Sequence, residues 1–214
     1  MQFDDVVRRR RMVRNYQDAP VPPALLDRVL EVALRGPSAG FTQGVDLLVL
    51  EGRDETSLFF ELTSDAAFIS RPEAMAGLRR APVIVLPLCD PAAYFERYAQ
   101  ADKSRSGLAE LPTENWPVPY WLVDSSFCVM LLLLAASDAG LGTLFFRLHE
   151  DPGRLFETLG VPKGRQSIGA VALGYEELAS QSSPHSPPGK GRPSGSPARR
   201  PRRPISESVH RGRW

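Results

Sequence analysis

The chain has 214 residues, which is enough for one domain with a complete hydrophobic core. Its composition, 43% hydrophobic and 24% charged, is ordinary for a globular protein, and its net charge of +1 excludes a polycation that binds nucleic acid through overall charge. The charge is uneven, because residues 181–203 contain several basic residues and no acidic one. The body of the chain is therefore mildly acidic and the tail is basic.

The first part of the chain alternates between helix and strand signals. Residues 3–11 predict a short helix, and a longer amphipathic helix begins at Pro23 and stops at Gly36. Residues 45–51 predict a mostly buried strand. A further helix is expected over residues 54–63, with an aspartate as its N-cap.

The middle of the chain contains the two most apolar segments. Residues 81–89 are rich in β-branched residues and predict an interior strand, in which Pro87 indicates the end of the strand or an edge position. Residues 90–118 are mixed and polar, which favours short helical pieces and loops. Residues 120–138 predict the longest and most apolar helix, which we expect to be central.

The remaining elements complete an α+β pattern. A turn at residues 140–142 leads into a third strand that extends to Phe146, a short helix follows over 152–159, and residues 166–175 predict a fourth strand. Helices and strands mix without the strict alternation of a doubly wound fold. We therefore expect an α+β sandwich, with helices covering a mostly antiparallel sheet.

The end of the chain differs in composition from the body. Residues 1–178 read as one domain, whereas residues 179–204 are rich in Ser, Pro, Gly and Arg and predict an extended segment without a core. Residues 205–214 form a more ordinary tail. No aromatic residue interleaves with the arginines of the extended segment, so nucleic-acid binding is disfavoured.

Cysteine usage and hydropathy favour a cytoplasmic protein. Cys89 and Cys128 each lie in an apolar run, as buried thiols of a reducing compartment do. The three histidines are far apart in the sequence, so no metal site is expected. The acidic N-terminus does not resemble a signal peptide, and the continuous apolar run over 127–136 is too short to span a bilayer.

Two segments near the N-terminus suggest a phosphorylated cofactor with a ring system. Five arginines lie between Arg8 and Arg14, and a guanidinium is a planar fork suited to phosphate. Residues 36–44 form a turn of small residues that lets backbone approach a flat ligand closely. Taken alone, the arginines favour a solvated helix face, and the small residues also fit an ordinary turn.

Motifs in order along the chain resolve this ambiguity, because together they resemble the nitroreductase family of flavoproteins. The resemblance rests on the arginine motif, the proline-rich linker into the first long helix, the small-residue turn, the second strand, the glycine turn and the C-terminal Arg-Pro-Ile motif. These are Arg10–Tyr16, Ala19–Leu26, Gly36–Val45, Ala81–Val85, Gly140–Thr143 and Arg203–Val209.

The resemblance implies a nitroreductase-like sandwich that forms an intertwined homodimer, with two FMN sites at the subunit interface. It implies hydride transfer from NAD(P)H through FMN to a small electron-poor acceptor such as a nitroaromatic or a quinone. The 205–214 tail would then pack on the dimer. The sequence contains no separate dinucleotide fingerprint that would distinguish NADH from NADPH.

The resemblance also implies which residues bind the cofactor. The arginine motif would contact the phosphate and ribityl chain, the small-residue turn would line the isoalloxazine, the glycine turn would approach the ring through backbone groups, and basic residues of the tail would return to the phosphate. In that order these are Arg10, Arg11, Met12 and Arg14; Pro37, Ser38, Ala39, Gly40 and Gln43; Gly140, Leu141 and Gly142; and Arg200, Arg202 and Arg203. Catalysis would belong to the flavin, with Arg14 as an electrostatic stabiliser.

The chain departs from the family pattern at three places. Met12 stands where the family has serine, Phe41 where it has asparagine, and Gly44-Val45 where Pro-Trp is frequent. These departures leave open a deazaflavin (F420) enzyme, a specialised dehalogenase-like member or a non-catalytic flavin-binding protein.

Two further features near the expected site have more than one interpretation. Asp124 is expected to hydrogen-bond at an interface or a cap rather than to act as a general acid. The aromatic residues between 94 and 121 would either roof the acceptor site or pack at the dimer interface.

Overall fold

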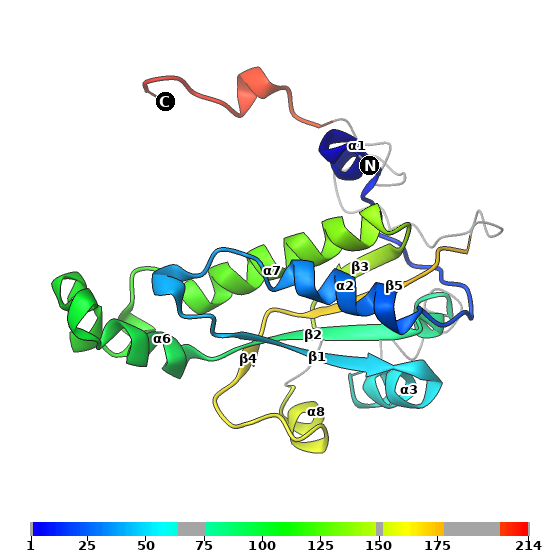
Figure 1. The fold of residues 1–214 in the computed structure, drawn as a ribbon, viewed down its shortest axis with the longest axis horizontal. Coiled ribbons are helices and arrows are strands. Elements are labelled where there is room, and N and C mark those ends of the chain that lie inside the picture. The colour runs from blue at the N-terminus through cyan, green and yellow to red at the C-terminus, as the bar shows by residue number, and fades with distance from the viewer. Residues whose placement is uncertain (1, 64–75, 149–151, 178–201, 214) are drawn as a thin grey trace, which may run out of the picture.

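The computed structural model describes residues 2–63, 76–148, 152–177 and 202–213. Its centre is an antiparallel sheet in the order β1–β2–β5–β3, with the short strand β4 paired to β2 (Figure 1). The strands are β1 (Val45–Glu51), β2 (Val83–Cys89), β3 (Gly142–Phe146), β4 (Gln166–Ser167) and β5 (Ala170–Gly174). The described α-helices are α1 (Phe3–Arg9), α2 (Pro23–Ala33), α3 (Gly52–Thr63), α6 (Pro91–Tyr98), α7 (Tyr120–Asp138) and α8 (Gly153–Thr158). The predicted α+β class is confirmed.

Helices cover both faces of the sheet because the strands are apolar on both faces. Alternate residues of β2 point to opposite sides, so Val83 and Val85 join the core beneath α2 and α7, whereas Ile84 and Leu86 join the core beneath α3 and α8. Figure 1 shows these two helix pairs on either side of the sheet. All seven residues of β2 are buried, as expected for a central strand.

The structure corrects the interpretation of Pro87. β2 continues through this proline and lies between β1 and β5, so it neither ends there nor forms an edge. On the side away from β1, residues 83–85 pair with β5 and residues 88–89 pair with β4. On that side Pro87 lies in the gap between these two ladders, where no described strand pairs with it.

Two element boundaries also differ from the prediction. The fourth predicted strand is divided into β4 and β5 at Gly169, whose φ is 144° and whose Cβ would lie 2.4 Å from the carbonyl oxygen of Phe146. Helix α3 begins at Gly52, so Asp54 lies in its first turn rather than at its N-cap.

The segment over 90–118 forms α6 and three 3₁₀ turns, as its mixed composition predicted. The turns are η3 (Ala101–Ser106), η4 (Leu108–Glu110) and η5 (Thr113–Asn115).

Helix α7 is the central helix, with the predicted bounds. By length and composition it could cross a membrane, but one face packs on α2 and the sheet through residues such as Leu132 and Leu133. Less than half of its apolar window is buried, and Phe127 and Met130 are 43% and 50% exposed. The helix therefore carries an apolar face that the described part of the chain leaves exposed.

The segment after α1 runs along the ends of β3 and β5. The Val13 amide donates to the Thr143 carbonyl at 2.8 Å, and the Gln17 amide donates to the Tyr175 carbonyl at 2.9 Å. Tyr16 is fully buried, and burial raises the pKa of its phenol. The hydroxyl remains protonated, 2.9 Å from the Val13 carbonyl oxygen, and helps to fix this segment on the sheet.

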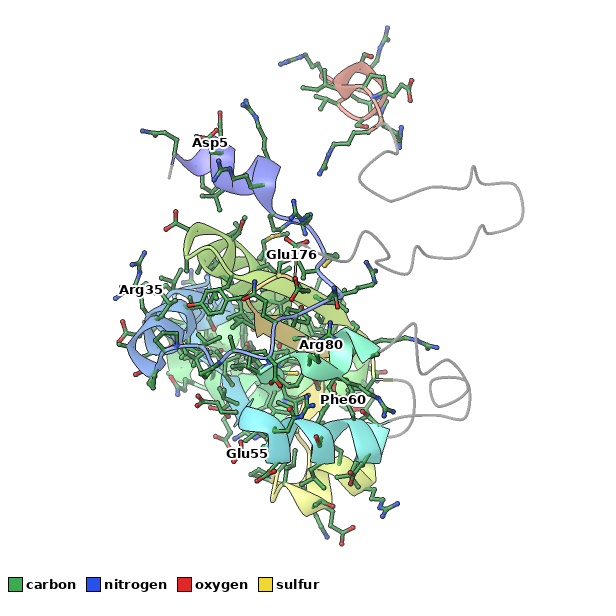
Figure 2. All side chains as sticks on the ribbon, turned by 90° about the vertical axis from the view of Figure 1, so that its right-hand side faces the viewer. Asp5, Arg35, Glu55, Phe60, Arg80 and Glu176 are labelled. Atoms are coloured by element: carbon green, nitrogen blue, oxygen red, sulfur yellow. The ribbon has the colours of Figure 1, made fainter. Side chains whose placement is uncertain are left out.

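The C-terminal segment over 202–213 includes the short turn η7 (Ile205–Glu207). All of its residues are exposed, including the apolar Ile205 and Val209. Figures 1 and 2 show it standing apart from the helices and the sheet of the body. Its predicted packing on a dimer remains a prediction.

Candidate flavin site

The arginine motif contains one guanidinium nitrogen that is buried and has no hydrogen-bond partner among the described residues. The Nη1 atom of Arg10 is inaccessible to solvent and has no hydrogen bond among the described residues. Arg10 directly follows α1, and the half-buried Arg14 lies four residues further on without an ion pair to a described carboxylate. Leaving a buried donor unsatisfied is unfavourable, so Arg10 fits an anionic ligand, and Arg14 adds a second positive charge to the same segment.

The other two residues of the motif have different surroundings. The Arg11 guanidinium forms an ion pair with Glu176, and its Nε also donates to that carboxylate at 3.3 Å. Met12 is 38% exposed, and its backbone forms a parallel bridge with Thr143 of β3. A phosphate contact from Arg11 would require this arginine to share its guanidinium with Glu176.

The small-residue turn is held closed by its own side chains. Its centre is the single turn η1 (Ala39–Phe41). The Ser38 hydroxyl accepts from the Gln43 amide at 2.8 Å, and the Thr42 hydroxyl donates to the Ala39 carbonyl at 2.6 Å. Hydroxyls that bond nearby backbone in this way define turns, so Ser38 has a structural role beside its predicted contact with the flavin.

Two other elements also contact this turn. From α7, the buried Asp124 carboxylate accepts from the Ala39 amide at 2.9 Å. From α6, the Arg97 Nε donates to the Gly40 carbonyl at 2.7 Å. Asp124 is the fifth residue of α7, so the expected hydrogen-bonding role is confirmed but the residue does not cap the helix.

The glycine turn after α7 has packing roles in this chain. Gly140 adopts φ 78°, and the Leu141 amide donates back to the Ala136 carbonyl at 2.8 Å, which is the Schellman arrangement that ends a helix. A Cβ on Gly142 would lie 2.7 Å from a methyl of Val13, so this glycine lets the arginine segment approach β3. Contact of these residues with a flavin remains a prediction.

The two halves of the predicted site lie at opposite ends of α7. The Ser38–Gln43 turn contacts α7 through Asp124 in its second turn, whereas the arginine segment pairs with Thr143, beyond the other end of the helix. A helix of 19 residues is roughly 28 Å long, and Figure 1 shows η1 and α1 at its two ends. The turn contacts α7 at its fifth residue, so roughly 21 Å of helix, about 14 residues, separate this contact from the other end of the helix, and the two groups of one chain lie far apart.

Aromatic side chains gather at the η1 end of α7. The Tyr98 ring stacks on Tyr120 at 6.0 Å and meets Trp116 edge-on at 5.3 Å. Trp116 and Trp121 are buried and pack with the fully buried Tyr94 in one small core. These rings therefore support the region from inside. Exposed aromatic surface near the turn comes instead from phenylalanines, among them Phe41 at 77% and Phe95 at 40%.

The remaining predictions for this site concern the tail and metals. Arg200 lies outside the described residues. Arg202 is exposed, and Arg203 forms an ion pair with Glu207 in its own segment, 3.7 Å from Nε to the carboxylate. Among the described residues no group of three or more His, Cys, Asp or Glu side chains could hold a metal ion.

Comparison with known proteins agrees with this architecture. The sequence profile of the nitroreductase family matches residues 7–175. The NADH dehydrogenase of Thermus thermophilus is 31% identical over 182 residues, which cover 78% of this chain and 83% of that protein. The 4-nitrobenzoate reductase of a Nocardioides species is 27% identical over 203 residues, which cover 82% and 81% of the two proteins.

A solved structure has the same fold. The nitroreductase family protein of Streptococcus pneumoniae TIGR4 superposes with a TM-score of 0.70 at 18% identity, covering 98% of this chain and 99% of that chain. The chain belongs to the nitroreductase family. It is an oxidoreductase of a family that uses a flavin together with a nicotinamide reductant.

Proposed function

We propose that this chain is an FMN-dependent oxidoreductase that acts as a homodimer with two flavin sites at the subunit interface. Bound FMN would supply the hydride chemistry, accepting from NAD(P)H and donating to an electron-poor acceptor such as a nitroaromatic or a quinone. The relative named as a 4-nitrobenzoate reductase supports the nitroaromatic class. The reaction would take place in the cytoplasm.

The separation of the two halves of the site along α7 is the observation that supports this proposal most strongly. In a dimer across the exposed apolar face of α7, the Ser38–Gln43 turn of one protomer can meet the arginine segment of the other. The buried, unpaired Nη1 of Arg10 fits the phosphate of FMN. A site shared in this way is complete only in the dimer.

The residues on the arginine side would bind and orient the cofactor. Arg10 would hold the phosphate, and Arg14 would keep a positive charge near the flavin at any physiological pH, where negative charge develops on reduction. The turn would place its backbone against the ring, with Ser38 and Gln43 fixed by their mutual hydrogen bond. No side chain of this set needs to act as an acid or a base.

The C-terminal part of the chain would complete the site. We propose that residues 1–178 form the flavin domain, that residues 179–204 extend from it, and that residues 205–214 pack on the dimer. The exposed Ile205 and Val209 give the tail an apolar surface for that packing. Arg202 or Arg203 would then reach the phosphate from this tail.

The visible spectrum of the purified protein tests the proposal directly. A yellow protein that loses its absorbance on anaerobic addition of NADH or NADPH is the expected result, and comparing the two nicotinamides identifies the reductant. A colourless protein that takes up F420 instead of FMN would identify a deazaflavin enzyme. Flavin uptake without reduction by either nicotinamide would identify a non-catalytic flavin-binding protein.

A further inference from the structure

We propose that Asp124 and Arg97 are positioning residues, which together hold the Ser38–Gln43 turn in a strained shape ready to receive the flavin. The inference rests on the proposed function, because it assigns a purpose to the turn that the flavin ring is expected to contact. It adds two side chains from outside the family motifs, one on α7 and one on α6, to the machinery of the site.

The turn needs external support because its backbone is strained. Gly40, Phe41 and Gln43 all have positive φ, at 64°, 57° and 54°. Glycine adopts this conformation freely, but each residue with a side chain costs roughly 1 kcal/mol there. Two such residues within three positions persist only where surrounding contacts fix the conformation, and such strain is concentrated at functional sites.

Asp124 supplies the contact from α7. The residue is 5% exposed, and its Oδ2 accepts both from the Ala39 amide at 2.9 Å and from the Tyr94 hydroxyl at 2.7 Å. Burying a carboxylate is costly unless donors replace water, so these two donors keep the side chain at its place. Burial and the neighbouring Asp124 raise the pKa of Tyr94, so its hydroxyl stays protonated and remains a donor.

Arg97 supplies the contact from α6. Its Nε donates to the Gly40 carbonyl at 2.7 Å, while Asp102 accepts from both terminal nitrogens at 2.8 and 2.7 Å. This bidentate pair fixes the plane of the guanidinium. The amide of Ala39 and the carbonyl of the next residue are thus held by separate elements, which fixes the peptide unit between them.

Two glycines allow these elements to approach the turn. A Cβ on Gly44 would lie 2.5 Å from the Tyr94 ring, so the ring takes the space of a side chain at position 44. This explains why a glycine stands where the family often has a proline. A Cβ on Gly40 would lie 3.2 Å from the Tyr98 ring, which encloses the turn from the α6 side.

A turn that is already in its receiving shape binds the flavin more tightly, because ordering it does not oppose binding. It also holds the ring in one orientation toward the acceptor, and such orientation contributes to rate. The contacts should therefore affect cofactor affinity more than global stability.

Amide hydrogen exchange and flavin titration of the full chain test the inference. In Asp124→Leu, which removes the acceptor, we expect the flavin-free protein to exchange at least tenfold faster over residues 36–44 and its Kd for FMN to rise about tenfold. Asp124→Asn keeps an acceptor oxygen and should stay within about threefold of wild type. Ser125→Ala is the matched control, because it removes a neighbouring buried hydroxyl that bonds the Trp121 carbonyl and not the turn.

A second variant tests the inference even if Asp124→Leu fails to fold. Arg97→Ala removes a side chain that is 21% exposed and near the surface, and it should give the same faster exchange and weaker FMN binding. Exchange equal to that of the Ser125 control, or faster exchange with an unchanged Kd for FMN, would overturn the inference. A wild-type protein that takes up no FMN would instead overturn the proposed function.

Discussion

A substitution at Arg10 should change FMN binding without lowering the folding stability of the protein. The buried Nη1 of Arg10 has no hydrogen-bond partner within the described ranges, so this nitrogen should contribute little to folding. In Arg10→Met we expect a Kd for FMN at least tenfold higher, with an unchanged or slightly raised Tm of the flavin-free protein. Fluorescence titration and thermal unfolding measure the two effects.

Arg8→Met is the matched control for that variant. Arg8 is on α1, 77% exposed and 4.0 Å from Asp4, so its loss should change neither quantity. If both variants bound FMN with equal affinity, Arg10 would have no part in the phosphate site.

Phe41 combines two unfavourable properties, a positive φ and a side chain that is 77% exposed. Phe41→Gly removes the backbone strain and little packing, and glycine entropy offsets part of the gain, so the free energy of unfolding should rise by up to about 1 kcal/mol. Urea unfolding of the flavin-free protein measures this. Leu111→Gly is the control: Leu111 has φ −106°, and its replacement should lower stability. A loss of stability in Phe41→Gly would contradict the inference that the backbone at Phe41 is strained.

The two cysteines should be inert in the folded protein, as their apolar neighbours in the sequence predicted. Both are buried, and burial raises the pKa of Cys128 to about 11 and that of Cys89 above its ordinary value. A raised pKa keeps the thiol protonated, so at pH 8 only about one Cys128 in a thousand is the reactive thiolate. Iodoacetamide at pH 8 should label neither cysteine until urea unfolds the chain, and rapid labelling of the native protein would contradict this burial.

At the scale of elements, a substitution at Gly44 tests how closely α6 packs against the turn. Its Cβ position is 2.5 Å from the Tyr94 ring, so Gly44→Ala must displace a fully buried aromatic residue and should lower stability by about 1–3 kcal/mol. Gly36→Ala is the control, because a Cβ there makes ordinary contacts of 3.5 Å with α7. If urea unfolding gave equal stabilities for the two variants, the Tyr94 ring would be able to move aside at little cost.

At the scale of elements, the sequence predicted those structures whose cause is local. The bounds of α7 could be predicted from its high apolar content, which is visible in consecutive residues. The split of the fourth strand at Gly169 was not predicted, because the close approach of Phe146 that requires a glycine there comes from another strand. Pro87 was misread because its tolerance depends on where two other strands pair with β2. A single sequence does not contain that information.

The same distinction applies to the candidate site. The arginine motif and the small-residue turn could be recognised from consecutive residues. The supports of the turn could not, because Arg97 and Asp124 bond to residues 57 and 85 positions away. The sequence indicated that Asp124 would form a hydrogen bond, because it is a carboxylate in an apolar helix, but it did not indicate the Ala39 amide as the partner.

At the scale of the whole molecule, α7 both separates and joins the halves of the site. It holds the turn near one end through Asp124 and leads into the strand that receives the arginine segment at the other. Its uncovered apolar face lies between them. A second copy packed on this face would therefore bury exposed apolar surface and complete two sites in one step.

A charge placed on that face should consequently remove both the dimer and the flavin. Met130 is 50% exposed in the single chain, so Met130→Lys should leave the monomer folded while a buried, unpaired ammonium opposes association. Analytical ultracentrifugation should show a shift from dimer to monomer, and the monomer should bind FMN at least tenfold more weakly because each chain then has only half a site. Thr158→Lys adds the same charge on the exposed side of α8, across the sheet, and should change neither quantity. A Met130→Lys monomer that still bound FMN with wild-type affinity would show that one chain holds the whole site.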